Sequence, residues 1–275
     1  MPGLRISAIS FLNTAPLMWD FEHGDAARDF EIAYTIPSSC AAALAANQAD
    51  IGIIPVFTYA QIPGLSIIPD VAIAAKDCVR SILLVSKKRI EDIRTVGADT
   101  SSRTSVALLQ VLFAKFFGGP RELRAHPPNL QEMLRENDAA LLIGDAALQV
   151  PPDAGYQLYD LAHLWHDFTG QAFVFAVWAV RDDSLARKPA GLNLNKVFQQ
   201  SRDHGLEPAS IDVIAQEWSP RLGLSTSLIR QYLTDNIHYY LDAEACAGLE
   251  LFLKLSQEIG LIAAVPELRF VTKTP

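Results

Sequence analysis

The sequence predicts a two-lobed α/β protein with a ligand-binding cleft between its lobes. Short apolar runs alternate with segments of helical period, which is the βαβ pattern of α/β proteins. In addition, the strand, polar loop and helix that begin at Arg5 recur at Arg94, and the stretch from Asn47 recurs at Asn137. Both matches keep an offset of about 90 residues, so we expect two lobes of similar fold. A chain of 275 residues that is 50% hydrophobic can bury the cores of two such lobes.

The strands are predicted where short apolar runs lie between polar or turn residues. These runs are Arg5–Ser10, Ile51–Pro55, Ser81–Ser86, Thr95–Ala98, Ala140–Ile143 and Phe173–Val180.

Three helices between these strands are predicted from their starting signals. A hydroxyl of Ser38 or Ser39 can cap a helix over Cys40–Asn47. A second helix, Val106–Phe117, follows Thr104 or Ser105 and stops at Gly118-Gly119-Pro120. A third begins at the capping box Asn129-x-x-Glu132.

Two strands are expected to carry the chain between the lobes, Ser81–Ser86 and Phe173–Val180. The first lobe then consists of residues 1–86 and 173–275, and the second of residues 87–172. This is the layout of a binding protein that closes on a hinge. Helices expected to pack on the first lobe follow at Leu192–His204, Ile211–Trp218 with Ser225–Tyr240, and Ala243–Ile259.

Composition excludes several classes of function. The 23 basic and 31 acidic residues give a net charge of −8, which is opposite to the basic surface that nucleic-acid binding requires. Cys40, Cys78 and Cys246 lie far apart without a CxxC pair, which argues against a structural zinc site or a disulfide framework. The N-terminus lacks the apolar region of a secretory signal, and no apolar stretch is long enough to span a bilayer, so a cytoplasmic location without membrane contact is expected.

Polar loops after the first strand of each lobe are the expected ligand contacts, because ligands of open α/β sheets lie beyond the carboxyl ends of the strands. The first loop offers Ser10, Asn13 and Thr14. In the second loop, hydroxyls, free helix N–H groups and one guanidinium can hold a carboxylate, and the residues are Thr100, Ser101, Ser102, Arg103 and Thr104. Ser38 and Ser39 are the third candidates. Simple helix capping remains the alternative for each hydroxyl.

Gly144-Asp145 ends an apolar strand, where Asp145 can act as an acid/base or accept a hydrogen bond from a ligand. Alternatively, Asp145 caps a short helix over Ala146–Val150. His163 and His166 have no cysteine or carboxylate nearby that would complete a metal site, so no metal is expected. The sequence contains no GxGxxG, P-loop or GxSxG pattern, so no cofactor is expected either.

Several blocks of the sequence resemble the chorismate dehydratase family, usually called MqnA, over nearly the whole chain. The blocks are Ser10-Phe11-Leu12-Asn13-Thr14-x-Pro16-Leu17, Pro37-Ser38-x-x-Ala41-x-x-Leu44, Asp50-Ile51-Gly52-Ile53-Ile54-Pro55-Val56 with Tyr59, and Arg80-Ser81-Ile82. The resemblance implies the fold of type II periplasmic binding proteins and the loss of water from chorismate to give 3-[(1-carboxyvinyl)oxy]benzoate in menaquinone biosynthesis. Ser81 and Gly144 are counted among the expected substrate contacts.

The sister family of 1,4-dihydroxy-6-naphthoate synthases shares this fold but carries a His-Glu-Gly-type motif where this chain has Ile143-Gly144-Asp145-Ala146. That departure favours the dehydratase. Dehydration chiefly requires that the enzyme orient the substrate and stabilise its developing negative charge. The substrate's own enolpyruvyl carboxylate can then remove the proton, while Asn13 helps to place the leaving hydroxyl or the side chain. Asp145 is the rival base. A non-catalytic protein that binds a small anion would have the same fold, and the oligomeric state stays open.

Overall fold

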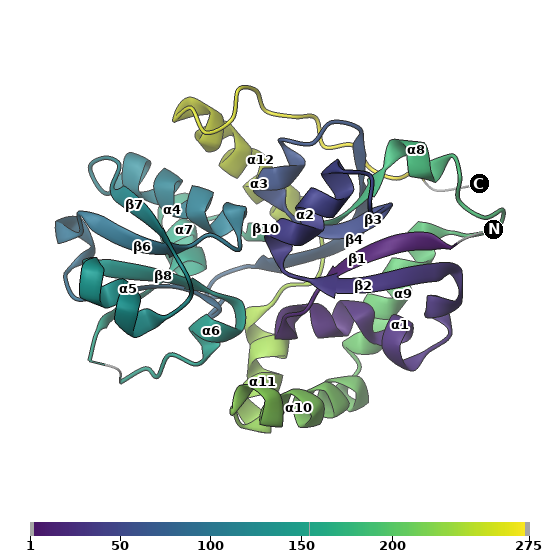
Figure 1. Ribbon diagram of the computed structural model, residues 1–275, viewed down its shortest axis with the longest axis horizontal. Helices are drawn as coiled ribbons and strands as arrows, with labels where there is room; N and C mark the ends of the chain where they lie inside the picture. The colour runs from purple at the N-terminus through teal and green to yellow at the C-terminus, as the bar shows by residue number, and fades with distance from the viewer. Residues whose placement is uncertain (1–2, 154, 273–275) are drawn as a thin grey trace.

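The computed structural model describes residues 3–153 and 155–272. The first and last positions of the predicted first lobe, residues 1–2 and 273–275, lie outside the described residues, as does residue 154. Two five-stranded sheets lie side by side (Figure 1). The first has the order β2-β1-β3-β10-β4, and the second has the order β7-β6-β8-β5-β9. The strands are β1 Leu4–Ile9, β2 Phe30–Thr35, β3 Ile51–Pro55, β4 Leu65–Ala75, β5 Ile82–Ser86, β6 Thr95–Asp99, β7 Glu122–His126, β8 Ala139–Ile143, β9 Gln157–Asp160 and β10 Phe173–Arg181.

The two sheets share one topology. In the first, β2, β1 and β3 run parallel and β10 is antiparallel to both β3 and β4. In the second, β7, β6 and β8 run parallel and β5 is antiparallel to both β8 and β9. The two lobes therefore repeat one fold, as the internal sequence matches predict.

Burial along the strands follows their place in the sheets. The central strands β3 and β8 are buried at every residue, whereas the edge strand β2 is buried mainly at Phe30. Parallel strands covered on both faces are apolar throughout. This explains why β3 and β8 are visible in the sequence while β2, β7 and β9 are not among the predicted strands. Strand β4 is also missing from the predicted strands although it is mostly buried, because Pro69 and Asp70 interrupt its apolar run.

Helices cover both sheets and follow the first strand of each lobe. In the N-terminal and central parts of the chain they are η1 Leu12–Met18, α1 Trp19–His23, η2 Ala26–Asp29, α2 Pro37–Ala45, α3 Val56–Tyr59, η3 Ile90–Asp92, α4 Arg103–Phe116, α5 Leu130–Glu136, α6 Gly144–Leu148 and α7 Leu161–Thr169. After β10 they are α8 Asp182–Leu185, α9 Leu194–Gly205, α10 Pro208–Leu222, α11 Thr226–Gln231, the π-helix η4 Tyr232–Asn236, and α12 Ala243–Glu258.

Two predicted helix starts are wrong and one is confirmed. Helix α2 begins at Pro37, and neither Ser38 nor Ser39 caps it, because proline is favoured at the first helical position. Helix α4 is capped by Ser102 instead of Thr104 or Ser105. Asn129 caps α5 as predicted, accepting a hydrogen bond from the Glu132 N–H at 3.3 Å.

The chain passes between the lobes twice, in residues 76–81 before β5 and in residues 170–172 before β10. Strand β5 pairs with β8 and β9, so residues 82–86 belong to the second sheet and not to the predicted first lobe. The C-terminal helix α12 packs against the second crossing. A Cβ on Gly248 would lie 1.9 Å from the Ala172 carbonyl oxygen, so only glycine permits this close approach.

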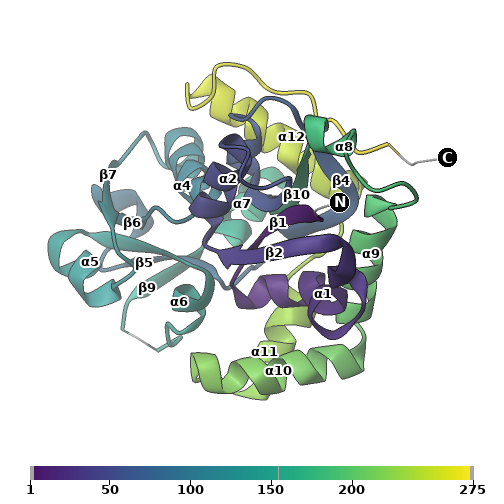
Figure 2. The ribbon, with the colours of Figure 1, turned by 45° about the vertical axis from the view of Figure 1, so that its right-hand side comes forward.

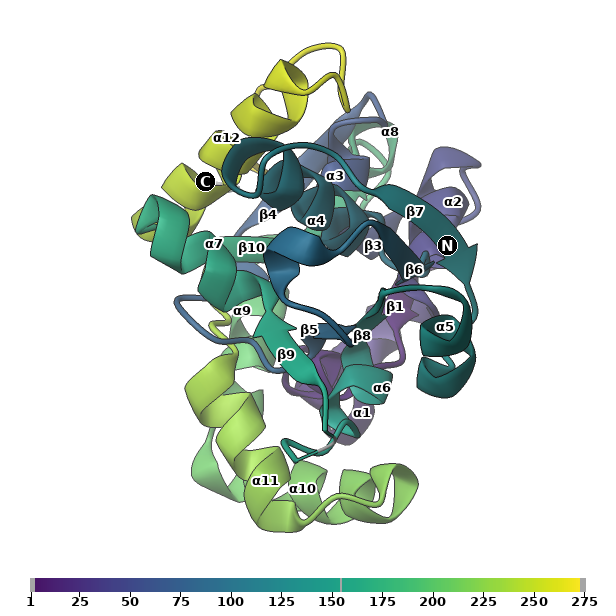
Figure 3. The same ribbon diagram turned by 90° about the vertical axis from the view of Figure 1, so that its left-hand side faces the viewer.

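The C-terminal helices pack mainly on the first lobe, as expected, although α12 also contacts α4 of the second lobe. Figure 2 shows α9 beside the first sheet, with α10 and α11 at one edge of the molecule. Figure 3, seen from the second lobe, shows α7 beside β10. Among the residues that the structure describes, no helix has the length and apolar character needed to cross a membrane.

Candidate active site

A narrow cavity of about 50 Å³ lies between the two sheets, where the first crossing and β10 meet the carboxyl ends of β1, β3 and β8. Phe11, Phe175 and aliphatic side chains form most of its wall. The polar groups in the wall are the side chains of Asn13, Ser81, Ser102 and Ser105. Among the described residues that line the cavity, none has an ionisable side chain.

Asn13 lies in η1, directly after β1, where the chain turns away from the sheet. Its side-chain oxygen accepts a long hydrogen bond from the Thr14 hydroxyl at 3.4 Å. Thr14 is buried, so the hydroxyl predicted to touch a ligand instead supports the amide that does line the cavity.

The first crossing positions Ser81 at the floor of the cavity. The Asp160 carboxylate accepts hydrogen bonds from the backbone N–H groups of Val79 and Arg80 at 3.0 and 2.6 Å. It also caps α7 through the Ala162 N–H at 2.9 Å. Arg80 has a φ of 60°, a conformation that costs a non-glycine residue free energy and that these bonds stabilise.

Gly144 connects β8 to this crossing, since its N–H donates to the Ser81 carbonyl at 2.7 Å. Its φ is 58°, and a Cβ there would lie 3.0 Å from the Phe11 ring. The position therefore needs glycine both for its backbone conformation and for the space in the cavity.

Ser102 and Ser105 lie at the start of α4. The Ser102 hydroxyl oxygen accepts bonds from the Ser105 N–H at 3.4 Å and from the Ser105 hydroxyl at 3.2 Å. Pro37, at the start of α2, also lines the cavity, and the Ser38 N–H beside it donates to the Ser101 carbonyl at 3.1 Å. Two helix N-termini therefore face the cavity from different lobes, and their partial positive charge favours a bound anion without a lysine or arginine.

Tyr232 is a fully buried residue of the π-helix η4. Burial raises the pKa of its phenol, while hydrogen bonding with Ser81 and Asn13 opposes that rise. The neutral phenol thus links two polar groups of the cavity wall. A π-helix is rare and often marks a functional segment. The sequence around Tyr232 gives no sign of such a helix, so sequence reasoning missed this residue.

Asp145 lies beside the cavity wall rather than in it. Its Oδ1 accepts a hydrogen bond from the Leu12 N–H of the other lobe at 3.2 Å. Burial raises the pKa of this carboxyl group to about 6, and the Leu12 N–H only partly offsets that effect. The structure records no capping bond to Asp145, which lies in the first turn of α6, so the helix-cap alternative is wrong.

The remaining predicted contacts lie outside this cavity, and some join the lobes. The Ser38 N–H donates to the Ser101 carbonyl at 3.1 Å, and the Phe57 N–H donates to the Thr104 hydroxyl at 3.1 Å. Arg103 is exposed and bonds to the Gln61 side chain at 3.3 Å. Ser10, Ser39 and Thr100 are exposed.

Comparison with known proteins identifies the family. A family model described as menaquinone biosynthesis matches residues 4–258. The chain belongs to this menaquinone-biosynthesis family. The match confirms the predicted family resemblance. Among curated proteins, the chain is 28% identical over 268 residues to a chorismate dehydratase of Thermus thermophilus, covering 91% of this chain and 93% of the relative.

Solved structures support the predicted fold of this family member. An Archaeoglobus fulgidus protein has a TM-score of 0.71 at 16% identity, covering 94% of this chain and 98% of that one. The periplasmic aliphatic sulphonate binding protein SsuA of Escherichia coli has a TM-score of 0.66 at 15% identity, covering 100% of this chain and 93% of its own. The menaquinone-biosynthesis family member therefore has a periplasmic-binding-protein-like fold, as predicted.

Proposed function

We propose that this protein is a chorismate dehydratase, which eliminates water from chorismate to give 3-[(1-carboxyvinyl)oxy]benzoate. Family membership and the similarity to the Thermus thermophilus chorismate dehydratase support this proposal. The observation that carries the mechanism is a mostly apolar, non-ionisable cavity with hydroxyls, one amide and two helix N-termini. We also propose that chorismate is the small-molecule partner of this protein and that the enzyme acts in the cytoplasm. The reaction requires neither a membrane nor a nucleic acid.

The substrate is a dianion, and the cavity has donors suited to its carboxylates. The Ser102 and Ser105 hydroxyls and the free N–H groups of α4 can hold the ring carboxylate. Holding it there stabilises the negative charge that spreads onto it when the ring proton leaves. The start of α2 lies beside the start of α4, and Asn13 and Ser81 then face the other end of the substrate.

The reaction breaks two bonds and forms a double bond. The C–H bond of the ether-bearing ring carbon gives its electron pair to the ring, and the neighbouring C–O bond releases hydroxide. The proton and hydroxide together leave as water, and the ring becomes aromatic. This gain of aromatic stability drives the reaction, so positioning the substrate supplies much of what the enzyme must contribute.

The substrate's own enolpyruvyl carboxylate is the base that we propose. The described cavity wall contains no carboxylate or histidine that could take the proton. Asn13 and Ser81 orient the side chain and the departing hydroxyl. Asp145 remains the rival, because a carboxyl group with a pKa of about 6 is well matched to proton transfer near neutral pH.

The direct test is to incubate purified protein with chorismate in the absence of added metal or cofactor. We expect a product lighter than chorismate by one water in mass spectrometry, with the absorbance of an aromatic ring. If the protein binds chorismate and leaves its mass unchanged, it is a binding protein and not a dehydratase. If it leaves chorismate untouched and instead forms 1,4-dihydroxy-6-naphthoate from the sister family's substrate, it is the sister enzyme.

A further inference from the structure

A cluster of three possible metal ligands lies at the first crossing between the lobes. Asp77 and Cys78 belong to the crossing, and His163 lies in α7 of the second lobe. The Nδ1 atom of His163 is 2.5 Å from Oδ1 of Asp77, and the Cys78 Sγ is 3.7 Å from that oxygen. One ligand atom from each residue lies within 4.8 Å of the other two.

Thiolate, imidazole and carboxylate are the ligands that zinc takes in proteins. Ligand atoms around a tetrahedral zinc ion are about 3.5 Å apart, so small rotations of the side chains would suffice. Asp77 and His163 are exposed and Cys78 is partly exposed, which gives them this freedom and gives an ion access.

Asp167 adds the feature that distinguishes this cluster from an ordinary hydrogen-bonded pair. It lies one turn after His163 on α7, with its Oδ2 3.5 Å from His163 Nε2. A histidine that binds a metal through one nitrogen usually donates its other N–H to a carboxylate, which orients the ring. Nδ1 would bind the ion here, and Nε2–H would donate to Asp167.

The local charge also favours a cation. The carboxylates of Asp77 and Asp167 both lie within 4 Å of the His163 ring nitrogens. Two carboxylates at such short range attract a divalent ion.

We propose that Asp77, Cys78 and His163 bind one zinc ion at the hinge, with solvent in the fourth position. The ion would connect the first crossing to α7, the helix that leads into the second crossing, and so restrain the hinge segments relative to each other. The sequence shows no ligand near His163, because Asp77 and Cys78, which the structure brings to it, lie more than 80 positions earlier in the chain.

The test uses the full-length protein, reduced and freed of metal with a chelator. Calorimetric titration with zinc chloride should give one site, and cobalt(II) should produce the charge-transfer absorbance of a cobalt–thiolate bond. Cys78→Ser should abolish that band, and Cys78→Ser and His163→Gln should each weaken zinc binding at least tenfold. Asp167→Asn should weaken it by about tenfold, as loss of a partner to a ligating histidine does.

Cys246→Ser is the matched control, because Cys246 is a partly buried cysteine in α12 outside the cluster. It should retain both the cobalt band and the zinc affinity. Circular dichroism before metal addition checks that every variant is folded. Absence of zinc binding in the wild type, or unchanged binding in Cys78→Ser, would overturn the proposal. Both readouts are independent of dehydratase activity.

Discussion

At the scale of single residues, Asp145 combines a raised pKa with a place just outside the cavity wall. If the substrate carboxylate is the base, Asp145→Asn should lose less than tenfold in kcat/KM, because asparagine can still accept the Leu12 N–H. A general base would instead contribute about 10²–10⁴-fold. Steady-state kinetics of the variant distinguish the two roles.

A substrate analogue gives an independent answer about the base. When the enolpyruvyl carboxylate of chorismate is replaced by a neutral amide, the analogue should bind but not dehydrate. Binding is measured by calorimetry and turnover by the loss of water. Rapid dehydration of the amide, together with a large loss in Asp145→Asn, would make Asp145 the base.

The raised pKa of Asp145 also predicts a pH-dependent stability. The pKa of Asp145 is about 6 in the folded state and 3.8 in the unfolded state, so the folded protein favours the protonated carboxyl group. The resulting contribution to the free energy of unfolding is fully present below pH 4 and is lost as the pH rises through 6. Asp145→Asn should therefore be more stable than wild type at pH 7, by at most about 3 kcal/mol. Urea unfolding between pH 4 and 8 should show the difference growing with pH; a constant difference would contradict the burial argument.

Asn13 provides the test of the cavity itself. Asn13→Ala should reduce kcat/KM at least tenfold, about 1.4 kcal/mol of transition-state stabilisation, with thermal unfolding near wild type. Asn129→Ala is the matched control, since it removes the cap of α5 far from the cavity and should cost about 1 kcal/mol of stability with full specific activity. If Asn13→Ala behaves like the control, Asn13 is a structural loop residue.

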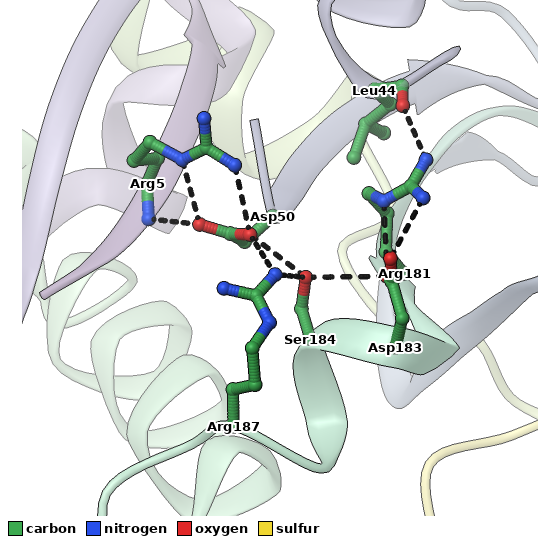
Figure 4. A network of polar contacts seen from close by, with 7 residues as sticks. All are labelled: Arg5, Leu44, Asp50, Arg181, Asp183, Ser184 and Arg187. Carbon is green, nitrogen blue, oxygen red and sulfur yellow. Dashed lines mark hydrogen bonds and ion pairs between the residues drawn. The ribbon is translucent and has the colours of Figure 1, made fainter. Parts of the chain in front are cut away.

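At the scale of elements, Asp50 ties β1, β3 and α8 together (Figure 4). Its buried carboxylate accepts bonds from the Arg5 N–H and Nε at 2.9 Å each, from Ser184 Oγ at 2.8 Å and from Arg187 Nη2 at 3.0 Å. Burial alone would raise the pKa of Asp50, but these donors outweigh it and hold the pKa well below its usual range. The network thus fixes the amino ends of β1 and β3, away from the cavity at their carboxyl ends.

Asp50→Ala should destabilise the protein by about 2 kcal/mol, less than for a fully buried pair, because Arg5 and Arg187 remain partly hydrated. In the wild type this stabilisation is present above the unfolded pKa of 3.8 and is lost as the pH falls through the lower folded pKa. Denaturant unfolding at pH 7 and near pH 3 should show the gap between variant and wild type narrowing in acid. Asp183→Ala, an exposed neighbour, should have a much smaller effect.

At the scale of the whole molecule, the lobes make direct hydrogen bonds to each other across the cavity. Three of these join Leu12 to Asp145, Ser38 to Ser101 and Phe57 to Thr104. We propose that residues 3–75 with 173–272 move against residues 82–169, about the two crossings. A ligand that contacts both lobes favours the closed arrangement.

Small-angle scattering should therefore show a smaller radius of gyration with saturating product than without it. Thr104→Val, which removes one bond between the lobes, should close less completely at the same ligand concentration. An identical scattering profile with and without ligand would count against hinge closure in this protein.

The sequence by itself determined the fold class, the repeated lobes and the family, because these depend on local signals. Central strands such as β3 and β8 are apolar throughout, and the Asn129-x-x-Glu132 box marks a helix start within four residues. It also predicted that the loop after β1 would place Asn13 at a ligand site, since strand ends fix where such loops lie.

The tertiary structure alone decided which polar groups meet. Of the hydroxyls predicted for the second loop, Ser102 lines the cavity while Thr104 bonds to the other lobe. Tyr232 reaches Ser81 from a helix 151 residues later, and His163 meets Cys78 across a lobe boundary. A local pattern encodes burial and backbone hydrogen bonding, whereas contacts between distant residues arise only when the two sheets and the C-terminal helices pack together.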